Sequence, residues 1–360
     1  MILFITLHTF GASAFAQQRT LFASITYRFD TVFAQRGILN HSADFCQPVT
    51  RGFLPRSVQS ILPTVGITKR RLKQLESIQL IREQRENGRQ QLAFHARPFI
   101  LCSLPLRRPP RNSTSHVRRN GKFFLQVIGH PQFGLPYGQD RLIAIWIATL
   151  ALRQRSRVVR FASAAEMLDF FHLFKDGKRY RRIMEGFQRI FAATIFFGTS
   201  DEPNGNLVLD WARFHFFDRM RLWFHKGEGE PVDSGSDENS IVLSEAFYEE
   251  IDQHRIPVER EVVAALADVP GVPDLYLWLS WKSWSLNGRS VRIPLFTQGG
   301  LVDELGPIEY SEKRFFRRKL ACWLREVRTF WPECPARISQ DGQALVVRSA
   351  KRTFAIASSQ

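Results

Sequence analysis

Two stretches of the chain carry the clearest helical pattern. In residues 68–87, apolar positions recur on one side of a charged segment, and Thr68 and Gly88 are placed to begin and end a helix. Residues 142–150 are instead apolar on nearly every side, as in a helix that is buried between neighbours. The pattern therefore predicts a helix with one apolar side, followed by a helix in the core.

The segment between these two helices has a different character. Residues 107–121 are rich in proline and polar side chains and contain five arginines, which is typical of an exposed segment. Two interpretations stay open for it: a solvated linker, or an arm that clamps a nucleic-acid backbone. Residues 122–128 then alternate in the manner of a strand.

The rest of the chain shows the same order of elements twice. Two more helices are predicted at residues 163–171 and 178–194, followed by β-like segments at residues 206–217 and 219–225. Three helices followed by a hairpin is the order of a winged helix, a variant of the helix-turn-helix. The second copy of this order consists of a strand at 241–243, helices at 244–254, 258–267, 273–284 and 309–330, and a hairpin at 336–347.

The predicted fold class is therefore α+β, with two tandem winged-helix domains. The first covers residues 66–226, including the N-terminal helix and the arm, and the second covers residues 241–352. Residues 227–240 are acidic and rich in Gly, Ser and Pro, so they are expected to form a linker between the two domains.

The beginning of the chain lacks any steady period. Residues 1–65 are expected to be a poorly structured extension, or the product of translation that begins upstream of the functional start. Residues 1–16 are apolar and end in the small-x-small form of a secretory cleavage site. No positive charge precedes the apolar run, which disfavours export.

The strong positive charge of the chain indicates what kind of partner it binds. The 360 residues carry a net charge of +16 and a pI near 10.3, which favours a polyanion such as nucleic acid or an anionic membrane. Residues 226–275 contain 13 acids and only three bases, so the remaining residues are more basic than the total indicates. No run approaches the roughly 18 apolar residues of a membrane span, so no membrane partner is expected.

Motifs for catalysis are absent from the sequence. It contains no P-loop, and its four cysteines have no zinc-ligand spacing, which favours free thiols in the cytoplasm. A rolling-circle nuclease would need a second histidine near His215. We therefore expect no enzyme activity, no cofactor and no metal.

The helix at residues 309–330 has two distinct faces. At about 100° per residue, its apolar stripe consists of Phe316, Leu320, Trp323, Leu324 and Val327. Arginine offers a planar fork that fits guanine or phosphate, and one helix fits the major groove. The DNA-binding residues predicted here and in the following hairpin are Lys313, Arg314, Arg317, Arg318, Arg325, Arg328 and Arg348. The alternative is a basic face that contacts only solvent.

The helix at residues 178–194 carries a second basic set. Its apolar side is predicted to include Ile183 and Phe187, with the bases turned away from it. Glu185 lies among those bases and would repel phosphate, so we expect a weaker DNA surface or a dimer contact. The predicted residues are Lys178, Arg181, Arg182 and Arg189.

Several segments together resemble the RepA family of plasmid replication initiators, in which a C-terminal RepA-type domain is recognised. The resemblance covers about residues 90–350 and excludes residues 1–65. The segments that carry it are GLPYGQDRLIAIWIATLAL at 134–152, SAAEMLDFF at 163–171, YRRIMEGFQRIFAATIFFGT at 180–199, FHFFDRMRLWF at 214–224, DLYLWLSWKSW at 274–284, IPLF at 293–296, GLVDELG at 300–306 and KRFFRRKLACWLREVRTFWPECPARISQDGQALVVRSA at 313–350.

The resemblance implies a cytoplasmic protein that acts by binding and not by catalysis. Its partners would be double-stranded plasmid origin DNA with repeated sequences, which it helps to open, and the host helicase or helicase loader. Similar initiators are tandem winged-helix proteins whose dimers repress their own promoter and whose monomers start replication, so a homodimer is a further partner. A winged-helix transcriptional repressor without a replication role is the alternative, and a nuclease is disfavoured by the missing motifs.

Overall fold

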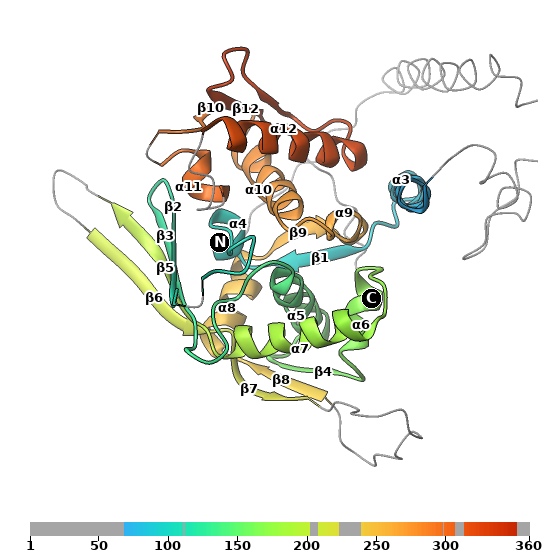
Figure 1. Cartoon of the computed structure of the whole chain (residues 1–360), viewed down its shortest axis with the longest axis vertical. Helices are drawn as coiled ribbons and strands as arrows, with labels where there is room; N and C mark the ends of the chain where they lie inside the picture. Colours follow the sequence, from blue (N-terminus) through green and yellow to red (C-terminus); the bar gives the residue numbers. More distant parts are fainter. Residues whose placement is uncertain are drawn as a thin grey trace, which may run out of the picture. The chain divides into compact units, whose positions relative to one another are not determined.

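A helix that is buried along most of its length, α5 (Asp140–Gln154), packs against β1, β4, α6, α7 and α8 (Figure 1). Its buried side chains surround the helix, as the sequence predicts. The computed structural model describes residues 68–110, 112–201, 208–222, 239–297, 299–306 and 313–350, all within one compact unit that begins at Thr68. The predicted extension at 1–65 and nearly all of the predicted linker lie outside the described residues.

The elements follow the predicted order with some additions. The other helices are α3 (Lys69–Glu86), α4 (Arg97–Leu101), α6 (Ala165–Phe170), α7 (Gly177–Phe191), α8 (Glu245–His254), α9 (Arg260–Leu266), α10 (Gly271–Ser285), α11 (Leu301–Leu305) and α12 (Lys313–Phe330). The strands are β1 (Leu92–His95), β2 (Ser115–Asn120), β3 (Phe123–Ile128), β4 (Val158–Phe161), β5 (Thr194–Asp201), β6 (Val208–His215), β7 (Phe217–Arg221), β8 (Asn239–Leu243), β9 (Ile256–Glu259), β10 (Ser290–Pro294), β11 (Ala336–Ile338) and β12 (Ala344–Arg348).

The largest described sheet contains a strand that the sequence did not predict. Its order is β2-β3-β5-β6, and all neighbours are antiparallel. The pattern predicted helix as far as residue 194, but α7 ends at Phe191 and the apolar run after it forms β5. The predicted hairpin of residues 206–217 and 219–225 is therefore wrong, because β6 pairs with β5 and β7 joins another sheet.

Two three-stranded sheets share one topology. Their orders are β4-β8-β7 and β10-β12-β11, so in each the first strand pairs with the last. In each, a short helix and then a longer one, α6 and α7 or α11 and α12, follow the first strand. Because β7 and β8 pair directly, residues 223–238 connect neighbouring strands of one sheet. Their interpretation as a linker between domains is not confirmed.

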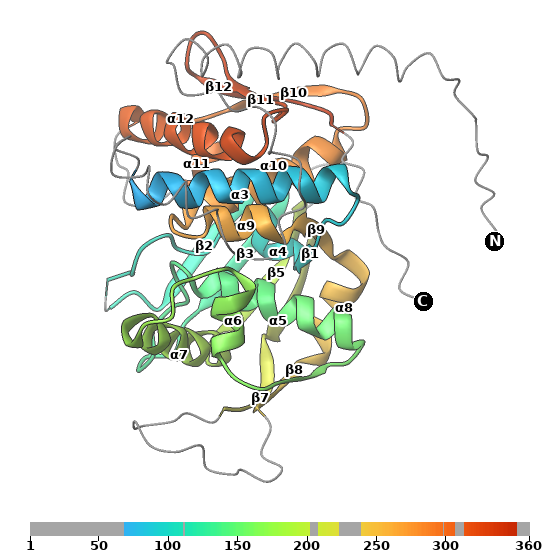
Figure 2. The ribbon, with the colours of Figure 1, turned by 90° about the vertical axis from the view of Figure 1, so that its right-hand side faces the viewer.

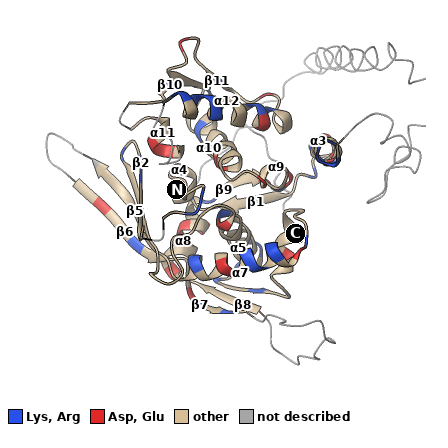
Figure 3. Ribbon diagram, in the orientation of Figure 1, with Lys and Arg blue, Asp and Glu red and all other residues tan. Residues whose placement is uncertain are grey.

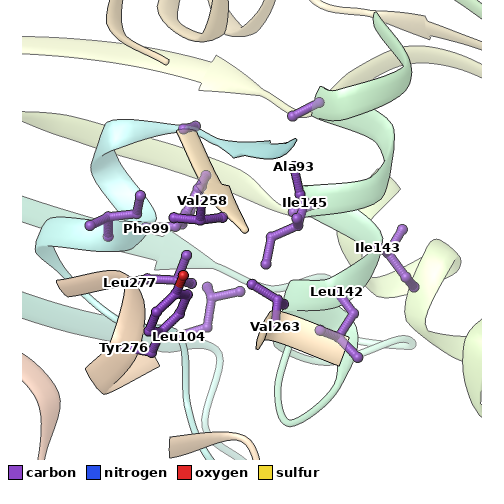
Figure 4. Close-up of a cluster of buried hydrophobic side chains, with 14 of the residues drawn as sticks. Ala93, Phe99, Leu104, Leu142, Ile143, Ile145, Val258, Val263, Tyr276 and Leu277 are labelled. Atoms are coloured by element: carbon purple, nitrogen blue, oxygen red, sulfur yellow. The ribbon is translucent and has the colours of Figure 1, made fainter. Parts of the chain in front are cut away.

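The core joins the two halves of the chain. Strand β1 pairs with β9, and Phe99, Leu142, Val258 and Tyr276 belong to one buried cluster (Figure 4). Helix α3 begins at the predicted cap, where the Thr68 hydroxyl accepts from a backbone N–H. It packs against α9 and α12, beside which it lies in Figure 2.

A buried carboxyl group holds α11 in place. The Trp278 Nε1–H of α10 donates to Glu304 Oε2 at 2.8 Å, and Arg118 of β2 donates to the backbone carbonyls of Asp303 and Gly306. Burial raises the pKa of Glu304 to about 7. Arg118 lies in the segment predicted to be exposed, yet it is buried, and burial lowers its pKa to about 10.

We expect Glu304→Gln to change how stability depends on pH. A carboxyl group whose pKa rises on folding stabilises the fold at low pH, and this contribution is lost as pH rises from its ordinary value of 4.5 through about 7. The non-titrating variant should therefore gain roughly 3 kcal/mol relative to the native chain between these limits. Urea unfolding at a series of pH values measures the difference, and parallel pH profiles would contradict the expectation.

Candidate nucleic-acid interface

Helix α12 is anchored by the apolar stripe that the sequence predicts. Phe316, Leu320, Trp323, Leu324 and Val327 are all buried, so the stripe is confirmed. The helix packs on α10, where a Cβ on Gly271 would overlap the Trp323 ring. Glycine at this position lets the two helices approach closely. Phe316 meets Phe296 edge to face, with centroids 6.2 Å apart.

The opposite face of α12 presents three arginines. Arg314, Arg318 and Arg325 are exposed, and Figure 3 shows basic positions along this helix. Arg314 lies over the Phe315 ring, and Arg325 contacts Cys322 one turn away. Glu326, a carboxylate of the described part of this helix, is half-buried and outside this row. The outward placement of the three arginines is confirmed, while their contact with DNA stays a prediction. We call these three residues the arginine row.

Two other predicted DNA-binding residues of α12 contact the hairpin of β11 and β12 instead. Arg317 is half-buried, lies over the Phe296 ring at 5.7 Å, and sits against the turn at Gly342. Gly342 has a φ of +65°, which favours glycine, as the predicted turn requires. Arg328 donates to the carbonyl of Ala336 at 2.6 Å. Both side chains therefore fix the hairpin to α12.

The last two predicted DNA-binding residues of this region lie at the end of β12 and at the start of α12. Arg348 is exposed at the end of β12, opposite Ser290. Lys313 begins α12, and its side chain lies outside the described part of the chain.

Helix α7 carries the second set of predicted DNA-binding residues. Lys178, Arg181 and Arg182 are exposed in its first half. Figure 3 shows basic positions along this helix. Arg179, which follows Lys178 in the chain, forms an ion pair with Asp268, with 3.5 Å between a guanidinium nitrogen and a carboxylate oxygen. The Asp176 side chain caps the helix by accepting from a backbone N–H at 2.7 Å. These three exposed bases remain a candidate surface for phosphate.

The predicted outward placement of Arg189 is wrong. It is only 7% exposed, and its guanidinium donates to both oxygens of Asp140 at 2.7 and 2.9 Å. The same guanidinium lies 4.6 Å from the centre of the Tyr137 ring. Burial raises the pKa of Asp140. Arg189 therefore clamps α7 to the start of α5 and is not available to DNA.

The residue after Asp140 makes a second buried ion pair. Arg141 pairs with Asp274 of α10, and both side chains are nearly inaccessible. Its remaining donors reach the carbonyls of Leu104, Pro105 and Gly138. Burial lowers the pKa of Arg141 to about 9. Sequence analysis overlooked these pairs, although a lone acid in an otherwise apolar helix indicates a buried partner.

The segment from the start of α7 to the end of β10 is similar to a known protein family. Residues 177–294 match the family model of the plasmid encoded RepA protein. The predicted resemblance to the RepA family is confirmed for this RepA-type segment. The segment contains α7 but ends before α12, so the resemblance of residues 313–350 stays a prediction.

Two solved structures of RctB are similar to the chain. The crystal structure of selenomethionine derivatives of domains 2 and 3 is 15% identical, with a TM-score of 0.46, and covers 69% of this chain and 97% of that chain. A second structure of domains 2–3 is 16% identical, with a TM-score of 0.45 and coverages of 70% and 97%. No curated protein sequence matches the chain.

The described residues offer neither a metal cluster nor a membrane span. The described part of the chain holds no cluster of three or more His, Cys, Asp or Glu side chains suited to a metal ion. Within these ranges no helix has the length and apolar character needed to cross a membrane.

We expect Trp323→Ala to lower the free energy of unfolding by about 3–5 kcal/mol, because it leaves a cavity between α12 and α10. Trp284→Ala is the matched control, since this tryptophan of α10 is 66% exposed. Urea unfolding followed by circular dichroism compares them. Equal losses in both variants would contradict the packing described for α12.

We expect Arg189→Ala to cost about 3–5 kcal/mol of stability, because it leaves Asp140 buried without its partner. Arg182→Ala, on the same helix but exposed, should change stability by less than about 0.5 kcal/mol. Urea midpoints at neutral pH test both. A stable Arg189→Ala variant would show that the ion pair does not hold α7 in place.

Proposed function

We propose that the chain is a plasmid replication initiator that binds double-stranded origin DNA mainly through α12. The observation that carries the proposal is the arginine row, which is exposed on a helix whose opposite face is fully buried. Planar guanidinium groups spaced along one helix fit base edges or phosphates in a major groove. The match of residues 177–294 to the RepA family model supports the replication role.

The proposal includes two winged-helix modules in tandem. The order helix, strand, helix, helix, strand, strand occurs as α5-β4-α6-α7-β7-β8, with β5 and β6 inserted after α7, and again as α10-β10-α11-α12-β11-β12. The equal strand orders of their sheets support this division. The third helix is the recognition element of such a module, which is the place of α7 and α12.

This division changes the predicted domain boundaries. Strand β8 completes the sheet of the first module, so this module extends to Leu243 and its boundary lies beyond the predicted one at residue 226. The second module then begins after Leu243, with α8, β9 and α9 leading to α10. Helix α7 would meet the adjacent part of the DNA repeat through Lys178, Arg181 and Arg182, with Glu185 weakening this contact.

In this function the protein acts in the cytoplasm by binding, without catalysis. It would open the origin duplex and recruit the host helicase or its loader, and homodimers would repress transcription. A transcriptional repressor could use the same DNA surface, so an origin-dependent replication assay separates the two functions. Loss of plasmid replication in the absence of the protein supports the initiator.

We expect Arg318→Ala and Arg325→Ala each to weaken duplex binding by about 1–3 kcal/mol if they contact bases, or to flatten its salt dependence if they contact phosphate. Fluorescence anisotropy with the plasmid's own origin repeats measures both effects. Arg255→Ala is the control, because this exposed arginine ends α8, a helix that Figure 1 shows apart from α12. Unchanged affinity in both α12 variants would remove this helix from the interface.

A further inference from the structure

The four-stranded sheet β2-β3-β5-β6 has one covered face and one open face. Leu125, Val127, Ile195 and Phe214 point to the covered face and are buried. Helices α8 and α11 contact this sheet, and Figure 1 shows described helices along one side of it only. The open face includes four exposed apolar side chains: Val117 at 44%, Ile128 at 37%, Leu209 at 53% and Trp211 at 43%. An open face of this composition is typical of an interaction surface.

One row of the open face crosses all four strands. Arg119, Phe124, Gly198 and Trp211 are neighbours in the register of β2, β3, β5 and β6. The rings of Phe124 and Trp211 stack with centroids 4.5 Å apart and planes 10° apart, and the Arg119 guanidinium lies 5.1 Å from the centre of the Phe124 ring. The three planar groups form one continuous stack across the sheet.

Glycine at the third position of the row makes the stack possible. A Cβ on Gly198 would overlap the backbone of Asp210 and Trp211, so β6 approaches β5 more closely than any side chain allows. Phe124 is only 5% exposed, whereas Trp211 remains 43% exposed. Trp211 lies on β6, the edge strand, beyond which the described residues add no further strand to this sheet. The stack therefore ends on an accessible indole ring.

The charges of the open face have one sign. By strand alternation its described residues include Arg119 and Arg213, both exposed, and no Asp or Glu. Gln126 and His215 are polar members of the same face. Such a face complements a polyanion whose planar groups can stack.

We propose that this open face binds a single strand of DNA, with an unpaired base stacked on Trp211 and phosphates near Arg119 and Arg213. Aromatic side chains on an open sheet are suited to unpaired bases, because every base offers a π-face. The bases of a duplex are already stacked on one another, so they are not available to Trp211. The proposal deepens the proposed function, since opening of an origin duplex releases a single strand.

The test measures binding of the full chain to a labelled oligothymidylate of about 16 nucleotides, the upper end of the site size of sheet-based single-strand binders. We expect Trp211→Ala to weaken this binding about tenfold, as loss of one stacked base implies. Trp211→Phe, which keeps a ring, should retain most of the affinity. Trp284→Ala is the matched control, because it removes a tryptophan that is 66% exposed on α10.

A second readout does not depend on the alanine variant folding well. Oligothymidylate should quench the tryptophan fluorescence of the native chain, and Trp211→Phe should lose most of this quenching while it still binds. Arg213→Ala should flatten the salt dependence of binding.

Three results would overturn the proposal: unchanged affinity in Trp211→Ala, equal losses in Trp211→Ala and Trp284→Ala, or a change of oligomeric state without a change of affinity. The last result would identify the face as a contact between copies of the chain. Duplex binding measured in parallel keeps this proposal distinct from the function of α12, because each surface has its own variants and its own DNA probe.

Discussion

Two buried ion pairs at adjacent residues fix the relative positions of the helices. Asp140 binds Arg189 of α7, and Arg141 binds Asp274 of α10. Removing one partner from such a pair leaves an uncompensated charge in the core, so these contacts tolerate little change of geometry. Since α12 packs on α10, the start of α5 determines how both basic helices are held.

Arginine serves three different purposes in the chain. In the arginine row of α12 the side chains face solvent, whereas Arg317 contacts the hairpin turn. Arg141 and Arg118 instead supply donors to buried carbonyl groups. Burial of these arginines does not make the surface less basic than the net charge of +16 indicates, because the described residues bury three arginines and five carboxyl groups.

The sequence predicted those features that depend on local periodicity. The faces of α12 follow from spacing within one helix, so Trp323 and Arg318 were both placed correctly. Arg189 could not be placed in this way, because its burial depends on Asp140, which is 49 residues away. The sequence also missed β5, since the apolar run after Phe191 continues that of α7 and hides the change of period.

The attachment of the hairpin to α12 has a consequence for recognition. Arg317 packs on the turn at Gly342, and Arg328 bonds to the first residue of β11, so two side chains of the helix attach the hairpin to it. A ligand that touches both elements has little backbone left to immobilise. Its binding would therefore carry a small entropic penalty and depend strongly on shape.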